Sequence, residues 1–120
     1  MPPPIAAVEA RVRTDLSARR VAEIGEYVGE LTGADVHLQG VDTNGMDFDI
    51  RTGPAERLRF RLGIVETPDG TAAQSRVEER SKSSEAGLLL YQRFVAEFVD
   101  TVRREDPHAV TAIHGGEHPG

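Results

Sequence analysis

The stretch "RLRFRLGIV", residues 57–65, carries the clearest alternating pattern in the chain. Apolar side chains occupy every second position and arginines lie between them: Leu58, Phe60, Leu62 and Ile64 alternate with Arg57, Arg59 and Arg61. Because successive side chains of a β-strand point to opposite faces of a sheet, this pattern predicts a half-buried strand. One face of the sheet is therefore expected to be apolar and the other charged.

The preceding stretch "GVDTNGMDFDI", residues 40–50, predicts a tight β-hairpin around Asn44 and Gly45. A three-residue loop over 43–45, closed by Gly45 in a bulge, would align Leu38 with Ile50 on the apolar face. A two-residue loop at Asn44 and Gly45 would leave Leu38 among charged side chains. The sequence therefore favours the three-residue loop.

These two stretches also predict their mutual register, provided that residues 52–56 form the turn between them. The resulting cross-strand pairs are Ile50 with Leu58 and Phe48 with Phe60 on the inner face, and Asp49 with Arg59 and Asp47 with Arg61 on the outer face. Acidic side chains of one strand would thus complement basic side chains of its neighbour.

Residues 15–35 predict an amphipathic helix with the apolar stripe Val21, Ile24, Val28 and Leu31. Asp15 or Ser17 can cap its start, and Gly33 can end it. Gly25 and Gly29 lie four residues apart, which would allow another element to approach closely.

A second, longer helix is predicted for residues 84–105, "SEAGLLLYQRFVAEFVDTVRRE", starting at Ser84 and ending before Pro107. Between the hairpin and this helix, residues 71–77 favour a fourth strand, with a helix as the open alternative. The order of elements predicts an α+β two-layer sandwich: a helix, an antiparallel meander of three or four strands, and a long C-terminal helix. Residues 15–106 are expected to form one domain, preceded by an extended leader at 1–14 and followed by a flexible tail at 107–120.

Composition excludes several classes of function. The chain has 120 residues, a formal net charge of -6, six aromatic side chains and no cysteine. Excess negative charge and few stacking side chains disfavour nucleic-acid binding, and the absence of thiols excludes disulfides and thiolate chemistry. No apolar run is long enough to span a membrane, and a cytoplasmic location is expected. No recognisable catalytic motif surrounds any serine or histidine, so an enzyme is not expected.

The sequence contains two clusters of potential metal ligands. His108, His114 and His118 lie in the expected tail, where glycines and Pro119 prevent a helix from bringing two of them onto one face. The acidic residues of "DTNGMDFD" lack the closing glutamate of a calcium loop. Neither a metal site nor a cofactor is therefore expected, and the histidines favour a solvated tail.

The alternating arginines Arg57, Arg59 and Arg61 are candidates for contact with an anion or a partner, because guanidinium groups present paired donors to carboxylates. The alternative is that they serve as cross-strand complements of Asp47 and Asp49. That structural role is the stronger interpretation.

Residues 40–77 resemble the small α+β domain appended to the pyridoxamine-phosphate-oxidase-like split barrels of haem-utilisation proteins. The hairpin and the arginine-bearing strand match its pattern at Val41, Asp42, Gly45, Met46, Phe48, Arg59 and Phe60. The resemblance implies an α+β fold and a haem-related small-molecule function as an alternative. The first helix lacks the histidine-containing segment of that family, and the tail histidines match no position of it.

The second helix predicts self-association, because its apolar side chains cover more than half of its circumference. A three-stranded sheet would leave part of this surface exposed, and a homodimer would bury it through Leu88, Tyr91, Phe94, Val95, Phe98 and Val102. Alternatively, a fourth strand and the N-terminal leader could cover these residues within one chain. The sequence is thus interpreted as a non-catalytic binding or regulatory module that acts through self-association and contact with a protein partner.

Overall fold

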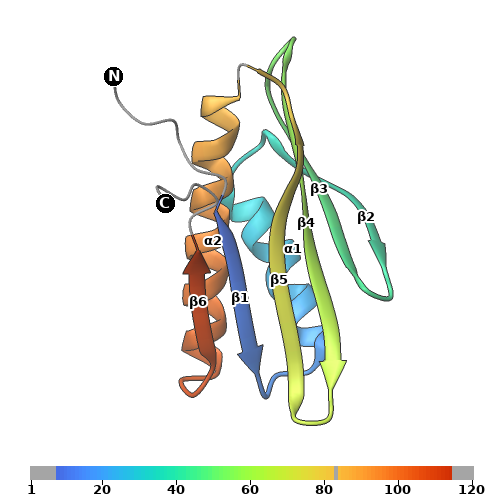
Figure 1. Cartoon of the computed structure of the whole chain (residues 1–120), viewed down its shortest axis with the longest axis vertical. Coiled ribbons are helices and arrows are strands. Elements are labelled where there is room, and N and C mark those ends of the chain that lie inside the picture. Colours follow the sequence, from blue (N-terminus) through green and yellow to red (C-terminus); the bar gives the residue numbers. More distant parts are fainter. Residues whose placement is uncertain (1–7, 83, 115–120) are drawn as a thin grey trace.

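In the computed structural model, which describes residues 8–82 and 84–114, two helices cover one face of an antiparallel sheet (Figure 1). The helices are α1 (Ala18–Thr32) and α2 (Glu85–Glu105). Within the described residues the strands are β1 (Glu9–Thr14), β2 (Val36–Asp42), β3 (Gly45–Gly53), β4 (Glu56–Thr67), β5 (Gly70–Arg80) and β6 (Val110–His114), in the spatial order β2-β3-β4-β5-β1-β6. The predicted α+β sandwich is confirmed, with six strands in this part of the chain instead of three or four.

The two additional strands, β1 and β6, correct the leader and tail assignments. Arg11 of β1 lies opposite Gln74 of β5 on one side and Ala112 of β6 on the other. The buried side chains of β1 are Ala10, Val12 and Thr14. Residues 9–14 therefore form an inner strand instead of a leader, and residues 110–114 form an edge strand instead of a tail. Residues 1–7 lie outside the described part of the chain.

The predicted pairing of β3 with β4 is confirmed at all four positions. Phe48 lies opposite Phe60 and Ile50 opposite Leu58, while Asp47 lies opposite Arg61 and Asp49 opposite Arg59. Residues 71–77 belong to β5, which confirms the preference for a strand.

The predicted register of the β2–β3 hairpin is wrong. The loop is two residues, Thr43 and Asn44, and Leu38 lies opposite Phe48 instead of Ile50. A bulge between Leu38 and Gly40 shifts the register, so Val36, Leu38 and Val41 all fall on the side covered by the helices. Without the bulge, a two-residue loop would place Leu38 on the charged face of the sheet. The extra residue in β2 returns Leu38 to the apolar face, so a two-residue loop is compatible with the burial pattern.

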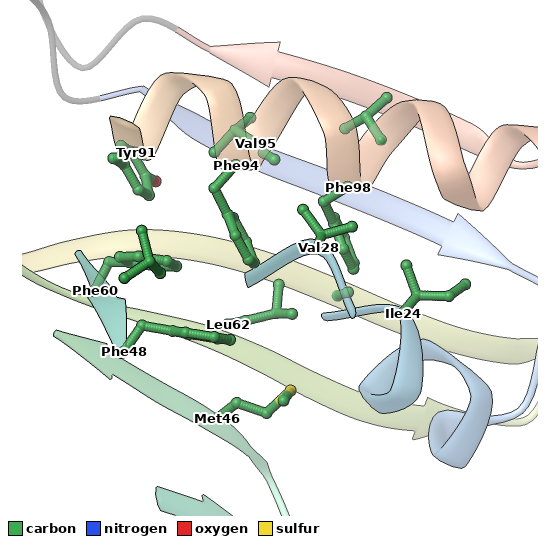
Figure 2. Close-up of a cluster of buried hydrophobic side chains, with 14 of the residues drawn as sticks. Ile24, Val28, Met46, Phe48, Phe60, Leu62, Tyr91, Phe94, Val95 and Phe98 are labelled. Atoms are coloured by element: carbon green, nitrogen blue, oxygen red, sulfur yellow. The ribbon is translucent and has the colours of Figure 1, made fainter. Parts of the chain in front are cut away.

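The core lies between α2, α1 and the inner face of β3 and β4 (Figure 2). Stacked rings of Phe48 and Phe60, with centroids 4.8 Å apart, face Phe94 and Tyr91 of α2. All six residues predicted to form a dimer interface are buried in this core: Leu88, Tyr91, Phe94, Val95, Phe98 and Val102. The interface assignment is corrected, because β5 and β1 widen the sheet enough to cover these side chains within one chain.

Helix α1 packs closely against the sheet at its two glycines. A Cβ at Gly25 would lie 2.8 Å from Leu62 Cδ2, and one at Gly29 would lie 2.9 Å from Phe48 Cε1. The predicted close approach is confirmed. Leu31, predicted on the buried stripe, is 51% exposed, because the buried face of the helix is turned toward the glycines.

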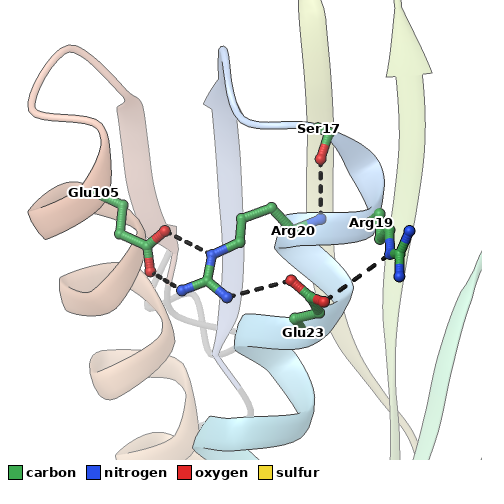
Figure 3. A network of polar contacts seen from close by, with 5 residues as sticks. All are labelled: Ser17, Arg19, Arg20, Glu23 and Glu105. Atoms are coloured by element: carbon green, nitrogen blue, oxygen red, sulfur yellow. Dashed lines mark hydrogen bonds and ion pairs between the residues drawn. The ribbon is translucent and has the colours of Figure 1, made fainter.

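The start of α1 is also linked to the end of α2 (Figure 3). The Ser17 hydroxyl accepts a hydrogen bond from Arg20 N, which makes Ser17 the N-cap. The Arg20 guanidinium donates two hydrogen bonds to the Glu105 carboxylate, and it contacts Glu23 of its own helix at 3.3 Å. These hydrogen bonds hold the pKa of Glu105 below its usual value. The arrangement fixes the relative position of the two helices.

Candidate functional site

The face of the sheet opposite the helices is open, and arginines dominate it. Alternation places Arg11 and Arg13 of β1 on this face, because Ala10, Val12 and Thr14 point toward the helices. Arg57, Arg59 and Arg61 of β4 project the same way, since Leu58, Phe60 and Leu62 are buried. We divide this face into a paired half, formed by β3 and residues 57–61 of β4, and a groove half, formed by residues 63–65 of β4 together with β5, β1 and β6.

In the paired half, the arginines have carboxylate partners. Asp49 is fully covered and accepts hydrogen bonds from Arg57 Nε at 2.9 Å and Arg51 Nε at 2.6 Å. Burial raises the pKa of Asp49, but the hydrogen bonds from Arg57 and Arg51 outweigh it, so the pKa lies below its usual value. The carboxylate therefore stays ionised and holds two guanidinium groups over the sheet.

Arg61 and Arg59 have partners as well. Arg61 binds Asp42 at 2.9 Å and Asp47 at 3.1 Å, and these hydrogen bonds raise the pKa of Arg61. Arg59 lies 3.2 Å from Glu79 of β5. The three arginines singled out from the sequence as anion or partner contacts are thus all engaged within the chain. Arg57 and Arg61 bind the predicted aspartates of β3, whereas Arg59 binds Glu79 of β5 instead of Asp49.

The groove half contains a shallow cavity of about 350 Å³. Its floor and walls are formed mainly by small and apolar residues of β4, β5 and β6: Gly63, Val65, Ala72, Val110 and Ala112, with Gln74 beside them. Val65 is 54% exposed and Val110 is 65% exposed, so apolar surface faces outward on both sides of the groove. Such a depression suits a short apolar segment or a small apolar molecule.

Arg11 and Arg13 lie in the middle of this groove half, on the strand between Ala72 and Ala112. Both are exposed, and within residues 8–82 and 84–114 neither forms an ion pair. Two neighbouring like charges without partners repel each other and attract an anion. The groove therefore combines apolar contact with two available guanidinium groups.

Sequence reasoning missed this pair because residues 9–14 were assigned to the leader. The available signal is the short alternation in "EARVRT", where Ala10 and Val12 separate Glu9, Arg11 and Arg13. An alternation over only six residues, directly after a proline-rich segment, is a weak signal for a strand. These residues form a strand because they pair with β5 and β6.

The buried polar groups of the described residues serve the fold. Tyr91 Oη lies 2.9 Å from Ser75 Oγ and donates to Val8 O, while burial raises the Tyr91 pKa to about 12. Asp106 accepts hydrogen bonds from Thr14 Oγ1 and from the backbone N–H of Asp15 and His108. It thereby ties the end of α2 to the end of β1.

Two of the three histidines of the C-terminal region lie within the described residues, at opposite ends of a strand. His114 ends β6, and His108 lies in the turn that precedes it. His118 lies outside the described residues. Among those that the structure describes, no group of three or more histidine, aspartate or glutamate side chains is arranged to hold a metal ion. No helix in the same part of the chain is long and apolar enough to cross a membrane.

Comparisons with known protein families, curated proteins and solved structures find no match to this chain.

Proposed function

We propose that the protein is a non-catalytic binding module that acts through contact with a protein partner and through self-association. The single observation that carries this proposal is the groove half of the open sheet face, where apolar surface surrounds two arginines that form no ion pair within residues 8–82 and 84–114. A surface that combines apolar area with exposed arginine is typical of protein interfaces. The buried titratable groups, in contrast, are engaged in structural hydrogen bonds.

The groove favours a partner segment with a defined chemistry. Val65, Ala72 and Val110 can contact one apolar side chain, and Arg11 and Arg13 can each bind a carboxylate beside it. An extended segment with alternating apolar and acidic residues would satisfy both requirements. The proposed partner is therefore a protein that presents such a segment.

A protein partner is favoured over a nucleic acid for two reasons. The chain has a formal net charge of -6, and most arginines of the open face are already neutralised by carboxylates. None of the six aromatic side chains lies on this face: five are in the core, and Tyr27 is on α1. Single-strand binding depends on aromatic stacking, which this face does not offer.

A phage-displayed library of random 12-residue peptides, panned on the protein, tests the proposal. We expect enriched peptides to carry Asp or Glu next to Leu, Ile, Val or Phe, and to bind Arg11→Glu/Arg13→Glu protein at least about tenfold more weakly. Arg59→Glu on the same face is the matched control and should retain binding. Peptides that bind the double variant as well as the wild type would overturn the groove as the contact surface. If an oligonucleotide binds more tightly than any peptide, and if its binding depends on Arg11, the proposed partner would be a nucleic acid instead of a protein.

The second candidate is binding of a small apolar ligand, for which the haem-related resemblance is one suggestion. The cavity volume of about 350 Å³ favours it, because small-molecule sites begin at about 300 Å³. A haem titration followed by absorbance tests this suggestion. A shifted Soret band that is lost when His108, His114 and His118 are replaced would favour the cofactor, and an unshifted band would reject it.

A further inference from the structure

The two edges of the sheet differ in their protection against pairing with another strand. Edge β2 contains the bulge after Leu38, a glycine at Gly40 and a charge at Asp42. Edge β6 reads "VTAIH" from Val110 to His114 and contains neither lysine, acidic residue, glycine nor proline. Natural sheets guard their edges with bulges, charges or prolines, so β6 is the less protected of the two edges in the part of the chain that the structure describes (Figure 1).

The direction of the backbone groups of β6 follows from its neighbour β1. Ala10 N donates to Ser75 Oγ of β5 at 3.0 Å, so the backbone groups of Ala10 point toward β5. In an antiparallel ladder the direction alternates, and those of Arg11 point toward its opposite residue on β6, Ala112. Thr111 and Ile113 therefore direct their N–H and C=O groups away from β1, toward the open edge.

We infer that this edge binds a second copy of the chain, with β6 pairing antiparallel to β6 of the partner. The inference rests on the self-association in the proposed function and specifies its surface. A twofold axis beside Ala112 would place Thr111 opposite Ile113 of the partner subunit on both sides of the axis. These two pairs use the outward N–H and C=O groups of all four residues, which gives four backbone hydrogen bonds.

Side chains near the edge fit a second copy. Ile113 is 49% exposed on the helix side, and Val110 is 65% exposed on the open side, so a strand beside β6 would cover apolar surface on both faces.

Self-complementarity favours a second copy over a foreign strand. The pairing about Ala112 puts Thr111 beside Ile113 and Val110 beside His114, with no like charges opposed. It also joins the two grooves across the axis, because Val110 and Ala112 line the groove at this edge. Five residues make a short interface, so we expect a dimer that dissociates in the micromolar range.

Sedimentation equilibrium over a hundredfold concentration range tests the inference. We expect a reversible dimer whose dissociation constant rises at least about tenfold in Ile113→Lys, because a charged edge residue opposes strand addition. Thr111→Pro removes an outward N–H without removing a bond to β1 and should act in the same direction. Leu38→Lys on the opposite edge is the matched control and should leave the dimer intact.

A single introduced cysteine tests the register, because the chain has no cysteine of its own. The two Ala112 residues would form a pair without hydrogen bonds, with Cα atoms about 4.5 Å apart. This separation lies within the range that a disulfide spans, about 4.4–6.8 Å. Ala112→Cys should therefore form a covalent dimer on mild oxidation, and Leu38→Cys should not.

Three results would overturn the inference: a 13.1 kDa species at every concentration, a dimer unaffected by Ile113→Lys and Thr111→Pro, or equal crosslinking of Ala112→Cys and Leu38→Cys. Failure of this inference can be distinguished from failure of the proposed peptide binding in the groove. If Ile113→Lys protein is monomeric and still binds the selected peptides in an Arg11-dependent manner, the groove and the edge act independently.

Discussion

The two halves of the open sheet face use arginine in different ways. In the paired half, Arg57 and Arg61 are bound to Asp49, Asp42 and Asp47. In the groove half, Arg11 and Arg13 have no carboxylate partner within the described residues, and small side chains surround them. The number of arginines on a face therefore does not identify a contact surface. Their partners within the chain decide whether they are available to a ligand.

The largest effect on stability is expected at the hairpin that carries the paired half. Gly45 has a φ of +152°, and a Cβ there would lie 2.4 Å from Leu62 O. Gly45→Val should destabilise the protein by about 2–5 kcal/mol, combining backbone strain with overpacking. Urea denaturation of Gly40→Val provides the control, since nothing lies within 4 Å of a Cβ at Gly40. Equal stabilities of the two variants would contradict the close packing of β3 on β4.

Asp49→Ala should be the most costly single charge removal in the paired half. Its carboxylate is fully covered and accepts two arginine hydrogen bonds, whose loss is expected to cost about 1–3 kcal/mol. Asp47→Ala is the matched comparison, because Arg61 keeps Asp42 as a partner. If thermal melting shows the same loss for both variants, Asp49 has no special role in this half.

The pH dependence of stability provides a second test of the role of Asp49. The pKa of Asp49 is lower in the folded protein than its usual value, so its ionised form is favoured by folding. This contribution is complete above the unfolded pKa of about 3.9 and is lost as pH falls through the lower folded value. Wild-type stability, measured by urea denaturation, should therefore fall below about pH 4 more steeply than that of Asp49→Asn. Parallel pH curves would indicate that Asp49 has an ordinary pKa.

Arg59→Glu should have a small effect, about 0.2–1 kcal/mol, because its ion pair with Glu79 is largely exposed. The variant places an acidic side chain beside Glu79, and added salt should reduce the loss. A loss well beyond this range in thermal melting would mean that another molecule buries the paired half.

The smallest effect on stability is expected for Arg11→Ser/Arg13→Ser in the groove half. Neither side chain has an ion-pair partner among the described residues, so melting should change by less than about 0.5 kcal/mol. Peptide binding should nevertheless be lost in the same variant. A pronounced destabilisation would show that these arginines serve the fold, and the distinction between the two halves would disappear.

Local patterns in the sequence predicted much of the fold. Alternation over 57–65 predicted β4 and its pairing with β3, and apolar spacing predicted both helices. These elements are long enough for their own side chains to define a period and a buried face. The bulge after Leu38 was not predictable from alternation. A bulge inserts one extra residue and so interrupts the period of two, and the side chains beyond it exchange faces.

The strands β1 and β6, and with them the groove, depend on contacts between segments that are distant in the sequence. Each is five or six residues long, and each becomes a strand by pairing with segments far away in the chain, since Arg11 lies opposite Gln74 of β5 and Ala112 of β6. Local periodicity was enough to predict the helices, the central strands and the charge pattern of β3 and β4. It did not determine which arginines remain without partners, since that depends on which strands lie side by side.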